Sequence, residues 1–339
     1  MIRRIAPALI VFLMLLWAAP HVAADQNANQ PLPNGEDIPA VFTTWARVVR
    51  PAWAYDAPNG RPIRALDDWD TWLSVKGSTV ADGVRWYRLH NGTWVNAGDV
   101  RFPPVTQFEG YRFQGDEHGT LGFVTENDTW MLQQPNPNGT YLGSLSRYTP
   151  VGLFDGTNGY YRIADGQYIW GEFVRPVKLT QRPAQVGPDE KWVDVNLTQQ
   201  TVVAYEGDTP VFATLTSSGK GKTPTAKGLF RIYEKHVSHT MAGGQPTTDE
   251  AKAKPKGDDL NDPYTLDEVP WSMYFYQRYA LHGAYWHDVF GQTRSHGCVN
   301  LSPSDSKFLF TWSGPVVPPG ANSVWATADN PGTWVWVHD

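Results

Sequence analysis

The sequence predicts a mainly β protein with minor helix, in which two small β-barrel-like repeats precede a larger β domain. The chain holds 31 Gly and 27 Pro among 339 residues, so turns interrupt it often. Short runs such as Trp86–Leu89 alternate apolar and polar residues, and Asn-Gly or Asp-Gly pairs separate them. Hydrophobic residues make up 41% of the chain and charged residues only 18%, a composition that forms packed cores.

Residues 1–24 have the layout of a secretory signal peptide. Two arginines precede an apolar run, and the small-residue triplet Val22-Ala23-Ala24 follows it. The run is about 15 residues, shorter than the roughly 20 that a spanning helix needs. We therefore expect cleavage after Ala24, no stable membrane span in the mature chain, and export to the periplasm or the cell wall. The polar, Pro-containing residues 25–39 read as a flexible tether.

Two stretches, residues 40–105 and 106–178, resemble each other. Three aromatic or apolar pairs recur at a constant offset of 74 residues, namely Trp86 and Tyr160, Trp94 and Tyr168, and Val100 and Val174. The two Asn-Gly pairs, Asn59-Gly60 and Asn138-Gly139, are 79 residues apart. Constant spacing toward the end with one small insertion indicates a tandem duplication. Both stretches are similar to bacterial Src-homology-3-like modules, which makes wall glycan a candidate partner. The alternative is that their aromatic residues only fill two small cores.

A third domain is expected at residues 190–328, after a linker at 179–189 and before a C-terminal extension at 329–339. Three β runs open this domain, at Lys191–Asn196, Thr201–Tyr205 and Val211–Leu215. Residues 234–270 read as a long irregular insertion, either a lid or a solvated loop.

One segment of this domain predicts a helix, Ser302–Trp312. Ser302 is suited to cap it, Pro303 suits its first turn, and Phe308, Leu309 and Trp312 share one face.

The chemistry-bearing segment is His282-Gly283 followed by Ser295 to Asn300, which reads Ser-His-Gly-Cys-Val-Asn. Cys298 is the only cysteine, so it forms no intramolecular disulfide. A thiol with an ordinary pKa of about 8.5 is a weak nucleophile at neutral pH, and a nearby imidazole activates it by taking the proton and leaving an ion pair. Gly297 allows a sharp turn, so that backbone N–H groups around Cys298 converge on an oxyanion.

These elements resemble the L,D-transpeptidases of bacterial peptidoglycan, whose hallmark is His-Gly followed by Ser-His-Gly-Cys-x-Asn. Further matches are Thr223-Pro224-Thr225, Lys227–Phe230 and the strand Val193–Val195, while Ala226 departs from the Pro of many members. The resemblance covers about 190–328 and implies a β-sandwich catalytic domain of the L,D-transpeptidase type. It implies no cofactor and no metal.

The resemblance assigns roles residue by residue. It makes Cys298 the nucleophile and His282 the general base, with the Gly283 carbonyl orienting the imidazole. Residues that would shape the site and contribute to the oxyanion hole are Ser295, His296 and Gly297. Candidates for substrate binding are Arg294, Asn300, Tyr274, Tyr276 and Trp286. Arg294 is equally well explained as a solvated charge, and the three aromatic residues as core packing.

The reaction that the resemblance implies is a two-step acyl transfer on peptidoglycan stem peptides. Cys298 would be acylated by the third residue of a tetrapeptide stem with release of D-Ala, and the amine of a second stem would accept the acyl group. Water as the acceptor would make the same site an L,D-carboxypeptidase. The resemblance also implies acylation of Cys298 by carbapenem-type β-lactams.

Three other interpretations remain at this point. A papain-like cell-wall cysteine peptidase would place its Cys before its His, the reverse of the order here. A zinc site at His236, His239 and His287 lacks a helix and a general-base Glu. A non-catalytic wall-binding protein would leave Cys298 unreactive. Nucleic acid is not expected as a partner, since the net charge of −6 gives no basic footprint.

Overall fold

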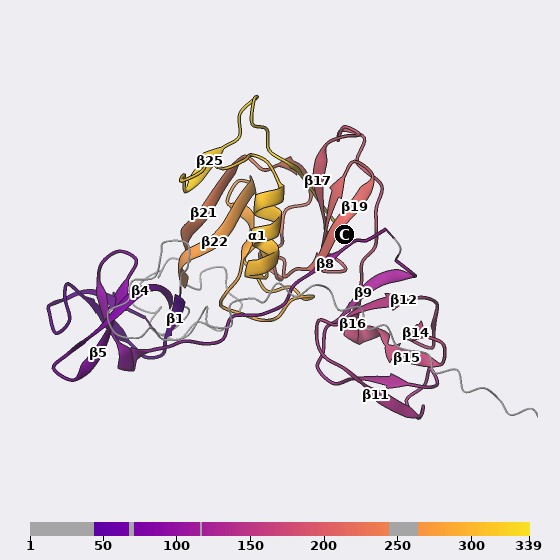
Figure 1. Cartoon of the computed structure of the whole chain (residues 1–339), viewed down its shortest axis with the longest axis horizontal. Coiled ribbons are helices and arrows are strands. Elements are labelled where there is room, and N and C mark those ends of the chain that lie inside the picture. Colours follow the sequence, from indigo (N-terminus) through magenta and orange to yellow (C-terminus); the bar gives the residue numbers. More distant parts are fainter. Residues whose placement is uncertain (1–43, 68–70, 116, 244–263) are drawn as a thin grey trace, which may run out of the picture.

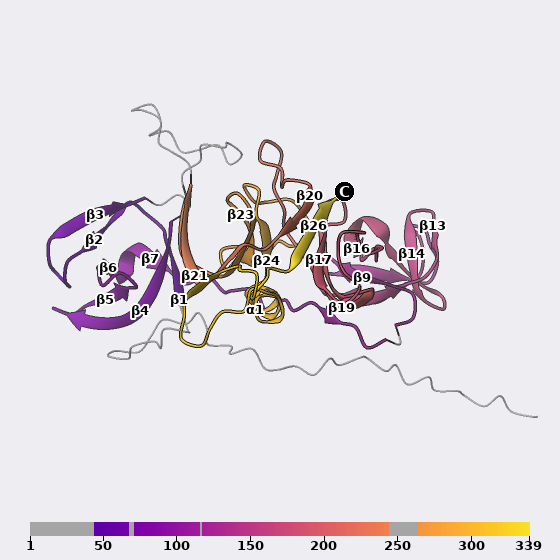
Figure 2. The ribbon, with the colours of Figure 1, turned by 90° about the horizontal axis from the view of Figure 1, so that it is seen from above.

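The structure is a computed structural model that describes residues 44–67, 71–115, 117–243 and 264–339. The expected signal peptide and tether, residues 1–24 and 25–39, lie outside these ranges. Three parts follow one another along the long axis of the molecule (Figures 1 and 2). We call residues 44–101 the first β unit, residues 120–176 the second β unit and residues 190–339 the central domain. In both views the central domain lies between the two β units.

The prediction of a mainly β fold with minor helix is confirmed. The first β unit contains β1 (Thr44–Val48), β2 (Ala52–Tyr55), β3 (Pro62–Leu66), β4 (Thr71–Ala81), β5 (Val84–Leu89), β6 (Trp94–Asn96), the 3-10 helix η1 (Ala97–Asp99) and β7 (Val100–Arg101). The second β unit contains β9 (Thr120–Val124), β10 (Thr129–Leu132), β11 (Tyr141–Leu145), β12 (Pro150–Leu153), β13 (Gly156–Thr157), β14 (Tyr160–Ala164), β15 (Gln167–Trp170), η2 (Gly171–Phe173) and β16 (Val174–Pro176). The described strands of both units form open sheets and close no barrel.

The central domain has two sheets and one helix among its described residues. Its elements are β17 (Lys191–Asn196), β18 (Thr201–Glu206), β19 (Thr209–Leu215), β20 (Gly228–Arg231), β21 (Glu234–Gly243), β22 (Tyr264–Tyr276), β23 (Tyr279–Gly283), β24 (Val299–Leu301), α1 (Pro303–Trp312), β25 (Ser323–Trp325) and β26 (Trp334–His338). One sheet has the order β20-β26-β17-β18-β19-β8, where β8 (Tyr111–Arg112) comes from the segment before the second β unit. The other contains β24-β23-β22, with β21 paired to β22 and β25.

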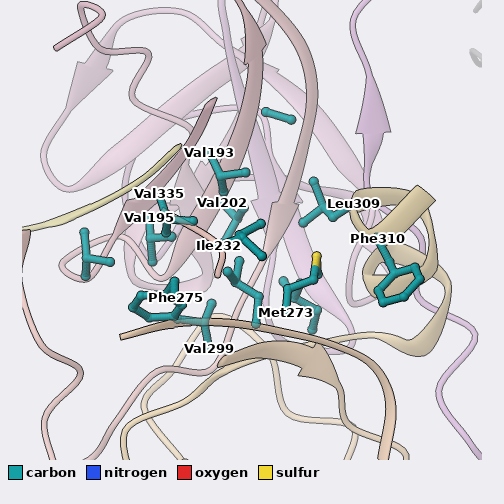
Figure 3. Close-up of a cluster of buried hydrophobic side chains, with 14 of the residues drawn as sticks. Val193, Val195, Val202, Ile232, Met273, Phe275, Val299, Leu309, Phe310 and Val335 are labelled. Atoms are coloured by element: carbon teal, nitrogen blue, oxygen red, sulfur yellow. The ribbon is translucent and has the colours of Figure 1, made fainter. Parts of the chain in front are cut away.

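The two sheets and α1 enclose one hydrophobic core. Figure 3 shows Val193, Val195 and Val202 from the first sheet facing Met273, Phe275 and Val299 from the second, with Leu309 and Phe310 of α1 at one side. All of these side chains are at most 5% exposed. This packing of sheet on sheet is the expected β-sandwich.

The predicted helix is confirmed with its cap. Ser302 Oγ accepts a hydrogen bond from the Asp305 amide at 3.1 Å, and Pro303 occupies the first turn. The cap satisfies one backbone donor that a helix N-terminus leaves unpaired, and proline at this position sacrifices no intrahelical bond.

The prediction of an irregular insertion at residues 234–270 is wrong for the part that the structure describes. Glu234–Gly243 and Tyr264–Tyr276 form a long antiparallel pair, with Glu234 opposite Tyr274 and Gly243 opposite Tyr264. Leu266, Val269 and Met273 are buried by this pairing. The rest of the expected insertion, residues 244–263, lies outside the described residues.

Residues 334–338 belong to the sandwich. β26 pairs in parallel with β17 and antiparallel with β20, so it lies inside the first sheet. The predicted domain boundary at residue 328 falls before this strand, so the residues expected as a C-terminal extension include a strand of the sandwich. The pairing joins segments about 140 residues apart in sequence, a separation that local patterns do not report.

Both β units are packed onto the central domain. β4 pairs in parallel with β22 through Thr71–Thr265 and Trp72–Leu266, so one sheet continues from the first β unit into the sandwich. On the opposite side, Phe123 of the second β unit shares a core with Trp192 and Tyr205 on the outer face of the other sheet. No helix in the described part of the chain has the length and apolarity needed to cross a membrane.

Candidate active site

Two neighbouring parallel strands bring the expected nucleophile and base together. Leu281 of β23 pairs with Val299 of β24, and His282 pairs with Asn300. Leu281 and Val299 point into the hydrophobic core. Because side chains alternate along a strand, His282, Asn300 and Cys298 lie on the opposite face. Cys298 directly precedes β24, so it is a diagonal neighbour of His282, and such neighbours are within reach of long side chains.

The imidazole of His282 is held in one tautomer. Its Nδ1 lies 3.3 Å from the Gly283 carbonyl oxygen, which only accepts hydrogen bonds, so Nδ1 carries the proton. Nε2 is therefore the nitrogen that accepts a proton. His282 is 2% exposed, and burial lowers its pKa to about 4. The ring is neutral at neutral pH, as a general base has to be.

Cys298 is partly exposed as a residue, and its Sγ lies 3.9 Å from the Arg278 carbonyl oxygen. Burial raises the pKa of this thiol to about 11, against the opposing effects of the Ala280 backbone and the Arg278 charge. Both pKa shifts favour the neutral thiol and the neutral imidazole. This differs from the ion pair that the sequence suggested, because a poorly solvated site disfavours both charged forms.

The Ser-His-Gly-Cys turn is fixed by Ser295. Its Oγ donates to the Cys298 carbonyl at 2.5 Å and accepts from the Gly297 amide at 3.0 Å. Gly297 has φ 118°, and a Cβ there would lie 2.3 Å from Cε1 of Tyr279. The Gly297 amide is already bonded to Ser295, so in this state Gly297 shapes the turn and does not offer an oxyanion donor.

Two tyrosines lie close to this turn, Tyr264 and Tyr274. The ring of His296 stacks on Tyr264, with centroids 5.4 Å apart. Burial, and then the Cys298 charge, raise the pKa of both Tyr264 and Tyr274, so the two hydroxyls lie within electrostatic range of the thiol. Tyr264 and Arg278 were absent from the sequence-based set. Tyr264 starts β22 and stacks on His296, whereas Arg278 lies in the turn after β22 with its carbonyl beside Cys298, and only the tertiary structure reveals both contacts.

Of the other substrate-binding candidates, one lies against His282 and two lie farther from it. The ring of Trp286 lies 5.6 Å from that of His282. Tyr276 packs against Phe230, with ring centroids 4.8 Å apart, at the edge of the hydrophobic core. Arg294 is exposed, and its charge lowers the pKa of His287.

Asn300 is bound to a histidine that the sequence singled out only for the zinc alternative. Its amide lies 3.0 Å from Nε2 of His287, and the Val289 amide donates to His287 Nδ1 at 3.3 Å. Burial lowers the pKa of His287 to about 3, so the ring is neutral. The Asn300 atom that lies at Nε2 is the amide nitrogen Nδ2. Oδ1 of Asn300 is buried without a hydrogen-bond partner among the described residues.

Only two of the three histidines of the zinc alternative meet, since the rings of His236 and His239 lie 4.6 Å apart on β21. His236 Nε2 bonds to Glu234 at 2.6 Å on β21, whereas His287 is bound to Asn300. In the described ranges no three His, Cys, Asp or Glu side chains are arranged to hold a metal ion.

Comparison with known proteins identifies the domain that carries this site. Residues 190–337 match the family model of the L,D-transpeptidase catalytic domain. No match was found among curated proteins. In a solved structure, the catalytic domain of an Enterococcus faecium L,D-transpeptidase is 26% identical with a TM-score of 0.32, over 44% of this chain and 98% of that chain. The same domain acylated by ertapenem is 25% identical, with a TM-score of 0.31 and the same coverage.

An L,D-transpeptidase from Stackebrandtia nassauensis is 25% identical with a TM-score of 0.29, over 46% of this chain. This chain spans 58% of the length of that protein. The family match, which ends inside β26, is the finding that assigns the domain. Residues 190–337 are therefore similar to the L,D-transpeptidase catalytic domain.

Proposed function

We propose that this protein is an exported L,D-transpeptidase that cross-links peptidoglycan stem peptides, with Cys298 as nucleophile and His282 as general base. One observation carries the proposal. The pairing of β23 with β24 supports a shared face for the two residues, and the Gly283 carbonyl at Nδ1 of His282 supports Nε2 as the nitrogen that takes the thiol proton.

The first half of the reaction forms a thioester. Sγ of Cys298 attacks the carbonyl carbon of the third residue of a tetrapeptide stem while its proton passes to Nε2 of His282. The C–N bond to D-Ala then breaks, and the departing amine takes the proton from His282. The raised pKa of the thiol and the lowered pKa of the imidazole fit transfer during the attack and not before it.

In the second half, the side-chain amine of another stem attacks the thioester. His282 accepts a proton from this amine and returns it to the thiolate as the C–S bond breaks. The Asn300 amide, with one polar atom unpaired beside the reactive face, would bond a stem-peptide group, and the exposed Arg294 would meet a stem carboxylate. Wall glycan remains a proposed partner of the β units.

The test is incubation of the purified protein with a soluble tetrapeptide stem, followed by mass spectrometry. We expect release of D-Ala and a dimer lacking one D-Ala. Cys298→Ala should abolish both products while the protein stays folded, and residual turnover above a few per cent contradicts the assignment of the nucleophile. D-Ala release without dimer identifies water as the acceptor and hence a carboxypeptidase.

A second measurement detects the acyl-enzyme. Incubation with ertapenem should add the mass of one carbapenem to the peptide that contains Cys298. An unmodified, titratable thiol after prolonged incubation would count against an acyl-transfer site.

A further inference from the structure

The segment between the proposed base and nucleophile contains residues 284–291, which we call the active-site loop. It carries Trp286, which lies against His282, and His287, which bonds to Asn300. The Ala284 amide donates to the Leu301 carbonyl at 2.8 Å, so the loop starts at the edge of β24. Any contact that fixes this loop also fixes the surroundings of the catalytic base.

The first β unit holds one end of the loop. The ring of Trp45 stacks on Tyr285 with centroids 4.2 Å apart and planes 12° apart, and Trp72 meets Tyr285 edge-on at 5.7 Å. Trp45 Nε1 and the Tyr285 hydroxyl both donate to the Asp267 carbonyl, at 3.2 and 2.7 Å. Tyr285 is 1% exposed, so its position depends on this packing and not on a marginal surface contact.

The second β unit holds the other end. Arg147 forms an ion pair with Asp288. The Phe290 amide donates to the Tyr148 hydroxyl at 3.2 Å, and Arg175 Nε donates to the Gly291 carbonyl at 2.8 Å. The anchors on the second β unit thus contact three of the last four loop residues.

His287 lies between these anchors and depends on them. Its Nδ1 accepts from the Val289 amide, and Val289 is flanked by Asp288 and Phe290, both held by the second β unit. Displacing that end of the loop would remove this bond to the His287 ring and disturb the contact between His287 and the Asn300 amide. Trp286 is placed by its neighbour Tyr285, whose ring lies 5.0 Å away edge-on.

We propose that the two β units are positioning parts of the active site, which clasp the active-site loop from opposite sides and orient Trp286 and His287. Figures 1 and 2 show the central domain between the units, as such a clasp requires. Domains that served only to tether the enzyme to the wall would not need to contact this loop. The positioning residues are Trp45, Tyr285, Arg147 and Asp288, and the inference rests on the proposed function for its activity readout.

A charge swap in the full-length protein tests the clasp of the second β unit. Arg147→Asp and Asp288→Arg should each lower kcat on a soluble tetrapeptide by at least about tenfold, since misplacing a catalytic group by about 1 Å costs up to about 100-fold. Hydrogen exchange of residues 284–291 should speed up in both. The double variant should recover both kcat and protection. Arg162→Ala is the matched control, because Arg162 pairs with Asp155 inside the second β unit.

Trp45→Ala tests the first β unit in the same way, with Trp45→Phe as the variant that keeps a ring and Trp53→Ala, at a 48% exposed site, as the control. Unchanged kcat and unchanged loop exchange in the Arg147, Asp288 and Trp45 variants would overturn the inference, as would losses confined to insoluble wall. If even the wild type releases no D-Ala, the proposed function fails, while loop exchange and the rate of Cys298 alkylation by iodoacetamide still decide whether the clasp exists.

Discussion

At the scale of single residues, Gly297 connects backbone geometry to chemistry. Its φ of 118° is strained for any residue with a Cβ, and a methyl group there would lie 2.3 Å from Tyr279. Both the backbone conformation and the contact with Tyr279 therefore exclude any residue with a Cβ at this position.

Gly297→Ala should lower kcat by about 100-fold or more, because relief of the contact with Tyr279 would move the adjacent Cys298. The measurement is D-Ala release together with thermal unfolding. Gly92→Ala is the matched control, since Gly92 also has a positive φ of 82° but nothing within 4 Å of the added methyl. It should lose stability of roughly 1–2 kcal/mol and keep its activity. Equal kcat in the two variants would mean that the turn does not position the nucleophile.

Also at the residue scale, the thiol pKa of about 11 makes a prediction about pH. The thiolate is the reactive form, so alkylation of Cys298 by iodoacetamide should speed up by roughly tenfold per pH unit below that pKa. Its rate should show no plateau between pH 5 and pH 9. Such a plateau would instead reveal a preformed thiolate–imidazolium pair.

Enzymatic kcat/KM should rise through the His282 pKa of about 4 and stay level at neutral pH, since His282 is then already the free base.

At the scale of elements, the two β units repeat one arrangement. η1 begins at Ala97 and η2 at Gly171, which preserves the offset of 74 residues between Trp86 and Tyr160. Each 3-10 helix follows a short strand and precedes another. This correspondence supports our proposal that the units arose by duplication, although they now contact different faces of the central domain.

The parallel junction of β4 and β22 contains a pH-sensitive contact. His90 Nδ1 lies 3.3 Å from Asp267, with Glu268 and Lys76 as the other charged groups that face it. The hydrogen bond to Asp267 raises the pKa of His90. Because the pKa of His90 is higher in the folded protein, the His90–Asp267 contact stabilises the fold fully below the unfolded pKa of about 6.5. This stabilisation is lost as the pH rises through the folded pKa of His90.

We therefore expect residues 264–267 to exchange backbone hydrogens faster at pH 9 than at pH 6, after correction for the intrinsic rate. His90→Gln should remove this difference. A pH dependence that survives the substitution would assign it to another group.

At the scale of the whole molecule, cores cross the boundaries between the three parts. Phe123 and Val177 share a core with Trp192 and Phe290, and Trp45 and Trp72 share one with Leu266 and Val269. Neither β unit can separate from the central domain without exposing buried aromatic surface to water.

Calorimetry of the full chain should accordingly give one unfolding transition, with the calorimetric and van't Hoff enthalpies in agreement. Trp45→Ala should lower its midpoint without splitting it. Two or three resolved transitions would show that the parts unfold independently and that the shared cores contribute little.

The sequence by itself determined what local chemistry dictates. Alternating residues and turn pairs specified a mainly β chain, Ser302 and Pro303 specified the start of α1, and the segment around Cys298 specified the kind of catalytic domain. Tertiary structure alone decided the pairings between distant segments. These include β26 inside the sandwich, β21 with β22 where a loop was expected, and the approach of Tyr264, Arg278 and His287 to the site. The ionisation of Cys298 and His282 was likewise decided by burial, since a pKa depends on the dielectric surroundings that distant strands create and not on neighbours in sequence.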